Sequence, residues 1–123
     1  MKMQESPEDY LEAILVLSKE KPEVRSIDVA HHLGFSKPSV SVAMKRLREN
    51  GYVDMDDQNY LFLTDEGLAI ARKIYERHRI LTDYLQSIGI SSQTAEKDAC
   101  RIEHVISDET FDRIKQIYLE NKN

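Results

Sequence analysis

A cysteine, a glutamate and a histidine stand close together in the segment ACRIEHVIS. It holds Cys100, the only cysteine of the 123-residue chain, followed by Glu103 and His104. In a helix these residues occupy positions i, i+3 and i+4 and share one face. A thiolate, a carboxylate and an imidazole on one face can ligate a divalent transition metal. The spacing therefore predicts part of a metal site.

Three further residues could complete such a site. Asp9 and Glu12 stand one turn apart in a predicted first helix, and His78 lies among apolar residues of a predicted long helix. Each also has an ordinary structural interpretation, as a capping carboxylate, a solvated carboxylate and a buried hydrogen-bonded histidine. Cys100 taken alone is more often a core residue than a ligand, and Glu103 with His104 is usually a surface pair. The metal-binding interpretation depends on the six residues together.

Capping signals place these residues on three different helices. The first helix is predicted to begin after the N-cap Ser6, with Pro7 at its first position, and to end near Lys19. The predicted N-caps of the last three helices are Thr64, then Ser91 or Ser92, and Ser107. The helix that carries ACRIEHVI is expected to run to Ile106.

The region between the first and the long helix has the pattern of a winged helix-turn-helix. A short helix after Ser26 ends at Gly34, and a second helix, capped by Ser36, ends at Gly51. The segments YVDM and YLFL, around the acidic turn DDQN, are typical of a small hairpin. We therefore predict a mainly α fold, with a winged helix-turn-helix DNA-binding domain over 1–70 and a helical metal-binding and dimerisation domain over 71–123.

The charge distribution qualifies the net charge. The chain carries −5, with 22 acids and 17 bases, which taken globally argues against a nucleic-acid partner. The stretch 35–48, however, holds four cations and no acid. Its candidate DNA contacts are Ser36, Lys37, Pro38, Ser39, Ser41, Lys45, Arg46 and Arg48. Residues at the start of this helix are expected to reach bases, and the last three cations to contact phosphates.

Composition excludes several classes of protein. No apolar run approaches the ~20 residues of a membrane span, the N-terminus has no apolar signal region, and one cysteine cannot form an internal disulfide. We expect a soluble cytoplasmic protein without a membrane partner. The chain offers no nucleophile motif and no Gly-rich phosphate loop, so we do not expect an enzyme. The alternatives are a winged-helix regulator that responds to a non-metal signal, and an architectural or purely dimeric interaction protein.

Four segments resemble one known family over nearly the whole chain. They are EDYLEAI, SKPSVSVAMKRLRENGYV, LTDEGLAIARKIYERHRIL and CRIEHVIS. They are similar to the diphtheria toxin repressor and manganese-transport regulator family of metal-dependent bacterial transcription repressors. The resemblance implies a homodimer on a pseudo-palindromic DNA operator, and a short, two-domain member without the SH3-like domain.

The resemblance also implies a ligand set, and its two branches differ there. The manganese branch uses the positions of Asp9, Glu12, His78, Cys100, Glu103 and His104, with glutamate in place of Cys100. The iron branch has the same Cys-x-x-Glu-His pattern as this chain, but methionine in place of Asp9. Its second site uses a glutamate and a histidine where this chain has Thr82 and Glu96. The sequence is therefore a hybrid of the two branches.

The donor types guide the choice of metal. A thiolate favours Fe(II), Co(II) or Zn(II), whereas carboxylates favour Mn(II). We expect Fe(II) or Mn(II), with a slight preference for Fe(II), and Zn(II) or Co(II) as substitutes in vitro. Asp9, Cys100, Glu103 and His104 form the expected main site, which Glu12 and His78 complete or extend to a second ion. Metal held between the two domains is expected to favour operator binding.

Overall fold

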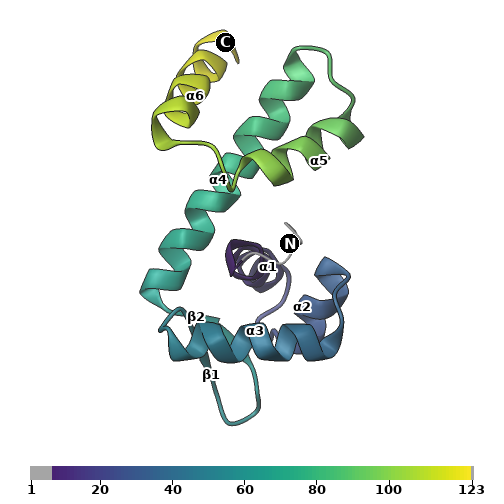
Figure 1. The fold of residues 1–123 in the computed structure, drawn as a ribbon, viewed down its shortest axis with the longest axis vertical. Coiled ribbons are helices and arrows are strands. Elements are labelled where there is room, and N and C mark those ends of the chain that lie inside the picture. Colours follow the sequence, from purple (N-terminus) through teal and green to yellow (C-terminus); the bar gives the residue numbers. More distant parts are fainter. Residues whose placement is uncertain (1–6, 123) are drawn as a thin grey trace. The chain divides into compact units, whose positions relative to one another are not determined.

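The computed structural model describes residues 7–122, which form two compact units, one up to Arg72 and one from Lys73. The elements, labelled in Figure 1, are α1 (Pro7–Glu20), α2 (Ser26–Leu33), α3 (Lys37–Glu49), β1 (Val53–Met55), β2 (Leu61–Leu63), α4 (Asp65–Ser87), α5 (Ser92–Ile102) and α6 (Asp108–Lys122). The predicted mainly α class with a small hairpin is confirmed. The predicted cap Ser6 lies outside the described residues. Among those described, no helix combines the length and apolarity needed to cross a bilayer.

The first unit is built around a helix-turn-helix. Gly34 ends α2 in the left-handed region, at φ 73°, which glycine adopts without strain. Ser36 then caps α3 by accepting from the Ser39 amide at 3.3 Å. Both helices pack against α1. The core side chains, each 5% exposed or less, include Leu11, Ile14, Val24, Val29, Val40, Met44, Leu47, Val53 and Leu61.

The hairpin β1–β2 forms the wing beside α3 (Figure 1). Its antiparallel register pairs Val53 with Leu63 and Met55 with Leu61. The amide of Leu61 also donates to the Val24 carbonyl at 2.7 Å, which ties the wing to the loop before α2. At the start of α4, a Cβ on Gly67 would lie 2.0 Å from the Tyr52 carbonyl oxygen. Only glycine fits there, so the wing and the first turn of α4 are held in close contact.

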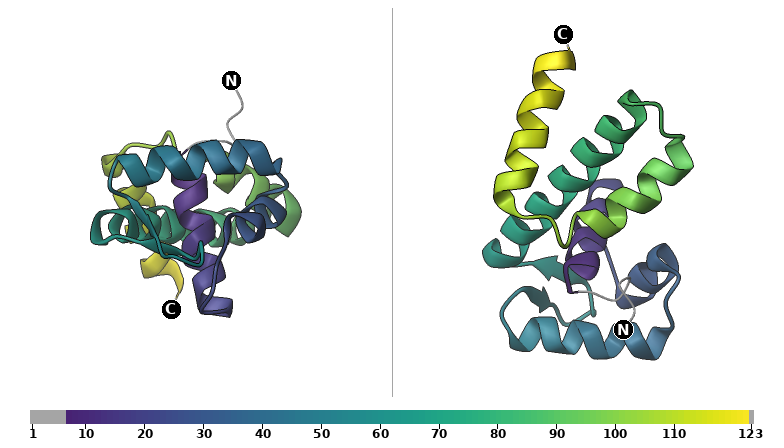
Figure 2. Two further views of the ribbon diagram at one scale, coloured as in Figure 1. Left: turned by 90° about the horizontal axis from the view of Figure 1, so that it is seen from below. Right: turned by 45° about the horizontal axis from the view of Figure 1, so that its top comes forward.

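The second unit packs α5 and α6 along the second half of α4, as the right-hand view of Figure 2 shows. Its core consists of Leu81, Ala99 and Phe111, with the partly buried isoleucines 80, 102, 106 and 114 around them. Caps set the helix starts: Ser91 accepts from the Thr94 amide at 3.3 Å. This decides between the two serines proposed from the sequence.

The end of α5 differs from the sequence expectation. We predicted a helix to Ile106, but α5 ends at Ile102, and Glu103 is its C-cap. The amides of Val105 and Ile106 both bond to the Ile102 carbonyl, which makes residues 103–106 a tight turn. Glu103 and His104 are therefore the first residues after the regular helix.

Candidate metal centre and nucleic-acid interface

The Glu103 carboxylate lies between two imidazoles in the second unit. Glu103 is fully buried, and its Oε1 is 2.7 Å from Nδ1 of His78 on α4. Its Oε2 is 3.6 Å from Nε2 of His104, whose side chain is 7% exposed. Among the described residues, Oε2 has no hydrogen-bond partner. A buried carboxylate oxygen that lacks a hydrogen bond is costly, so this site suits a cation.

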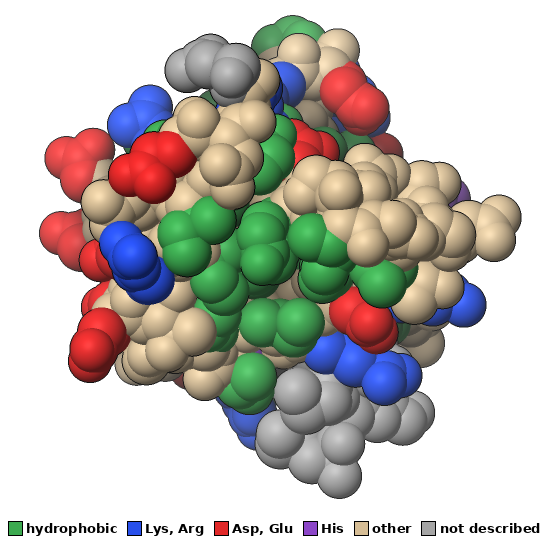
Figure 3. Space-filling model, turned by 90° about the horizontal axis from the view of Figure 1, so that it is seen from above, with side chains coloured by type: hydrophobic (Ala, Val, Ile, Leu, Met, Phe, Trp, Pro, Cys, Tyr) green, Lys and Arg blue, Asp and Glu red, His purple; other side chains and the backbone are tan. Residues whose placement is uncertain are grey.

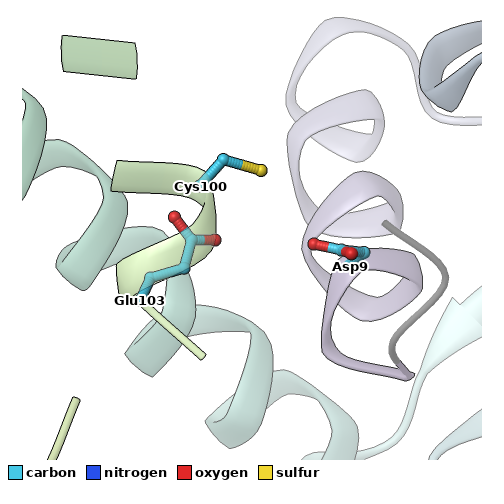
Figure 4. Close-up of side chains that lie close together, drawn as sticks. All are labelled: Asp9, Cys100 and Glu103. Atoms are coloured by element: carbon cyan, nitrogen blue, oxygen red, sulfur yellow. The ribbon is translucent and has the colours of Figure 1, made fainter. Parts of the chain in front are cut away.

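The thiol of Cys100 is available as a further donor. Cys100 is exposed, which disfavours its interpretation as a core residue. It lies one turn before Glu103, and both side chains leave the same side of α5 (Figure 4). The two imidazoles, the carboxylate and the thiol of this unit are the donor types that divalent transition metals prefer. The residues present therefore fit a metal ion.

The two remaining candidates belong to the first unit. Asp9, also drawn in Figure 4, and Glu12 stand one turn apart on α1. Asp9 is only 6% exposed and Glu12 is partly buried. This burial disfavours the interpretation of Glu12 as a fully solvated helix residue. The capping interpretation of Asp9 involves Ser6, which is outside the described residues.

A buried arginine holds the turn that carries Glu103 and His104. Arg77 on α4 is 6% exposed, and its Nη1 donates to the carbonyls of Glu103 at 3.1 Å and Ile106 at 2.9 Å. Its Nη2 donates to Asp108, the first residue of α6. The guanidinium also stacks on the Phe111 ring, 5.4 Å from the centroid. Arg77 thus satisfies carbonyls at the end of α5, where a cation also complements the helix dipole.

The sequence analysis did not single out Arg77. An arginine in a charged amphipathic helix is usually solvated, and nothing in its spacing marked it as different. Its partner Asp108 also binds Lys73, at 3.1 Å. Hydrogen bonding and charge from Lys73, and then the charge of Arg77, lower the pKa of the Asp108 carboxyl. Asp108 is therefore held in its ionised form.

The candidate DNA contacts lie on the exposed side of α3. Lys37, Ser41, Lys45 and Arg48 recur at helical spacing, and all four are exposed. Pro38 and Arg46 are exposed as well, whereas Ser39 is partly buried. Ser36 and Ser39 hydrogen-bond to each other at the cap. The structure therefore presents one basic helix face to solvent.

Replacing Arg77 by methionine should destabilise the protein by about 2–3 kcal/mol. Methionine replaces the aliphatic part of the arginine side chain but leaves the Glu103 and Ile106 carbonyls without their donor. Urea unfolding followed by circular dichroism measures the loss. Arg79→Met is the matched control, because Arg79 is exposed on the same helix and its loss should cost less than about 0.5 kcal/mol. Equal losses of stability in both variants would contradict the role of Arg77 in holding the turn.

Comparison with known proteins adds independent evidence. The family model "Iron dependent repressor, N-terminal DNA binding domain" matches residues 2–60. The model "Iron dependent repressor, metal binding and dimerisation domain" matches residues 64–122. The first match covers α1 to β1 of the winged helix, and the second covers α4 to α6.

Individual relatives agree with the family models. The transcriptional regulator MntR of Escherichia coli is 39% identical over 108 residues, which is 88% of this chain and 70% of the relative. An uncharacterised HTH-type transcriptional regulator of Methanocaldococcus jannaschii is 33% identical over 120 residues, covering 96% of this chain and 95% of its own.

Solved structures share the fold. A manganese-dependent transcriptional repressor in complex with manganese superposes with a TM-score of 0.84 at 28% identity, over 92% of this chain and 52% of that one. The metal-dependent transcriptional regulator MtsR gives 0.84 at 29% identity, over 91% and 53%. The chain thus spans about half the length of these structures. The resemblance seen in the sequence is confirmed: the chain belongs to the iron-dependent repressor family, whose members are metal-dependent transcriptional regulators and not enzymes.

Proposed function

We propose that this protein is a metal-dependent repressor of metal-ion homeostasis genes, in which Fe(II) or Mn(II) favours binding to an operator. The observation that carries the proposal is the buried Glu103 carboxylate between His78 and His104, with the Cys100 thiol on the same side of α5. Membership of the family and the exposed basic face of α3 support the same function. Because its operator is DNA, we place its action in the cytoplasm.

The proposed ligands are Asp9, Glu12, His78, Cys100, Glu103 and His104. Four of them belong to the second unit and two to α1 of the first. A bound divalent ion would supply positive charge to a set that contains three carboxylates and a thiol. Without a cation, these anionic groups would repel one another. Drawing them together would couple the winged helix to the second unit and favour the DNA-binding arrangement.

A non-metal regulator is the remaining alternative. A protonated His78 would form an ordinary ion pair with Glu103, and the pair would then be purely structural. That interpretation gives no role to the exposed thiol one turn away, nor to the Glu103 oxygen that lacks a hydrogen bond within residues 7–122. Metal binding accounts for both, so we favour it.

The metal preference follows from the thiol. Cys100 adds a soft donor to a set that otherwise resembles the manganese branch of the family. We propose Fe(II) as the preferred ion, with Mn(II) second. The solved structure that holds manganese supports the alternative order. Zn(II) and Co(II) should also bind in vitro, since affinity of such sites rises along the first transition row.

DNA binding is proposed to depend on α3. Its exposed cations, Lys37, Lys45, Arg46 and Arg48, would contact phosphates or guanine edges. The wing is acidic by contrast, with Asp54, Asp56 and Asp57 all exposed. Like charges repel the phosphates, so α3 must supply most of the attraction. This concentrates DNA contact on one helix of an acidic chain.

We further propose that the second unit forms a homodimer, which requires a pseudo-palindromic operator. Three of its large hydrophobic residues are exposed: Ile88 at 58%, Val105 at 70% and Leu119 at 45%. Figure 3, viewed from the end of the molecule where α6 stops, shows hydrophobic side chains gathered into a continuous area. An area of this kind is typical of an interaction surface, and the family's second domain is described as a dimerisation domain.

Removing a ligand should abolish metal dependence. We expect Glu103→Gln and His104→Ala to weaken Fe(II) and Mn(II) binding by at least about 100-fold, more than the loss of an outer-shell partner. Calorimetry on the reduced protein without oxygen measures this, and anisotropy of labelled DNA measures the metal-dependent gain in affinity. His32→Ala is the control, because His32 is exposed on α2. If both ligand variants keep wild-type metal binding and metal-dependent DNA binding, the non-metal regulator is correct.

Changing Cys100 should change the preferred metal. Cys100→Glu replaces a soft donor by a hard one, so the ratio of Mn(II) to Fe(II) affinity should rise roughly tenfold. Cys100→Ser removes the sulfur without adding a carboxylate and should lower Fe(II) and Co(II) affinity without a gain for Mn(II). Competition titrations of each variant give the ratios. Unchanged ratios in both variants would show that the thiol is not a ligand.

A charge in place of an exposed hydrophobic residue of the second unit should break the dimer. Val105→Glu or Leu119→Glu places a carboxylate where the proposed contact must exclude water. Light scattering coupled to gel filtration should then report about half the wild-type molar mass. Phe62→Glu is the matched control, since Phe62 is 47% exposed but lies on β2. A wild-type protein that is already monomeric with metal bound would refute the proposal.

A further inference from the structure

Val42 is an exposed apolar residue at the centre of the basic helix α3. It is 53% exposed, whereas the other large apolar residues of the helix, Val40, Met44 and Leu47, are at most 5% exposed. A β-branched residue on the solvent side of a helix gains no packing and is a weak helix former. Neither stability nor helix propensity therefore explains valine at this position.

The surroundings of Val42 separate it from an ordinary exposed valine, which needs no explanation. It lines an open hollow that α3 shares with Tyr10 of α1. The hollow is lined by Tyr10, Pro38, Ser39, Val42, Ala43 and Arg46. Pro38 is one turn before Val42, and Lys45 and Arg46 are three and four residues after it, so both cations adjoin it on the helix surface. Val42 is thus an apolar spot with Lys45 and Arg46 on one side and Pro38 on the other.

The cations determine what can cover this spot. A helix that exposes Lys37, Lys45, Arg46 and Arg48 attracts a polyanion and disfavours an apolar protein partner. The proposed function already places this helix in the major groove of DNA. The one apolar group on the base edges of that groove is the C5-methyl of thymine.

We propose that Val42 is a specificity-determining residue that contacts the C5-methyl group of a thymine in each half of the operator. This inference rests on the proposed DNA-binding function and deepens it. The neighbouring cations attract DNA of any sequence, whereas Val42 discriminates thymine from cytosine, which presents no methyl group there. Because the serines of α3 are short and weakly specific, the methyl contact carries a large share of base selection.

The experiment begins with enrichment of duplexes from a synthetic library with a randomised centre. The full chain is used with Mn(II), and with Fe(II) without oxygen. Each thymine of the enriched duplex is then replaced by deoxyuridine, together with its symmetry mate in the other half-site, which removes only the two methyl groups. At one such pair, the wild type should lose about 16-fold in affinity, which is about fourfold for each methyl group. Val42→Ala should lose a similar factor on the thymine duplex and nothing more on the deoxyuridine duplex.

Two further variants sharpen the test. Val42→Thr keeps one methyl and should retain part of the discrimination. Lys45→Ala should weaken binding to all duplexes and reduce its salt dependence, but keep the full response to deoxyuridine. Since Val42 is exposed and alanine is the better helix former, Val42→Ala should unfold at or slightly above the wild-type temperature.

The outcomes are distinguishable. In one outcome the wild type binds the enriched duplex tightly, but the losses of binding free energy from Val42→Ala and from deoxyuridine are additive at every thymine. The proposed methyl contact is then wrong, and the DNA-binding function stands. If the wild type enriches no duplex with either metal, the proposed function fails and the inference fails with it.

Discussion

The buried guanidinium of Arg77 is the interaction on which the arrangement of the second unit depends. A cation removed from water needs partners for its donors. The Nη1 and Nη2 groups find theirs at the end of α5 and the start of α6, whereas Nε has no hydrogen-bond partner among the described residues. The same contact holds the turn that follows α5, because the carbonyls of Glu103 and Ile106 accept from Arg77. Glu103 and His104 are thereby held on a tight turn beside α4. Arg77 thus positions the main chain from which Glu103 and His104 reach the candidate metal centre.

The buried Glu103 carboxylate is stable only with compensation nearby. Full burial of a charged group is expensive unless opposite charge or donors surround it. His78 supplies one contact to Oε1, and His104 approaches Oε2 without a hydrogen bond. A buried carboxylate with incomplete compensation lowers the stability of the metal-free protein. The same carboxylate gives the site a strong preference for a cation. Binding of a cation would then lower the free energy of the folded protein strongly. A metal sensor needs such a difference between its metal-free and metal-bound states.

Charge is separated along the chain in a way that suits regulated DNA binding. The exposed cations of α3 contrast with the acidic wing and with a net charge of −5. An acidic protein with one basic helix binds DNA weakly by non-specific attraction, because most of its surface repels phosphate. Correct placement of that helix therefore matters more than overall charge. In a dimer, placement means the separation of two such helices.

Local sequence alone determined the elements and the types of residue available for chemistry. The caps Ser36 and Thr64, the glycine that ends α2 and the basic helix were all readable, because each depends on neighbours within one or two turns. Tertiary structure decided the rest: the contact of His78 with Glu103, the early end of α5 and the choice of Val42 as the exposed apolar residue of α3. These features depend on side chains 25 or more residues apart, or on which helix face the core covers. Helical periodicity carries no information about such distant partners, so only the folded chain brings them together.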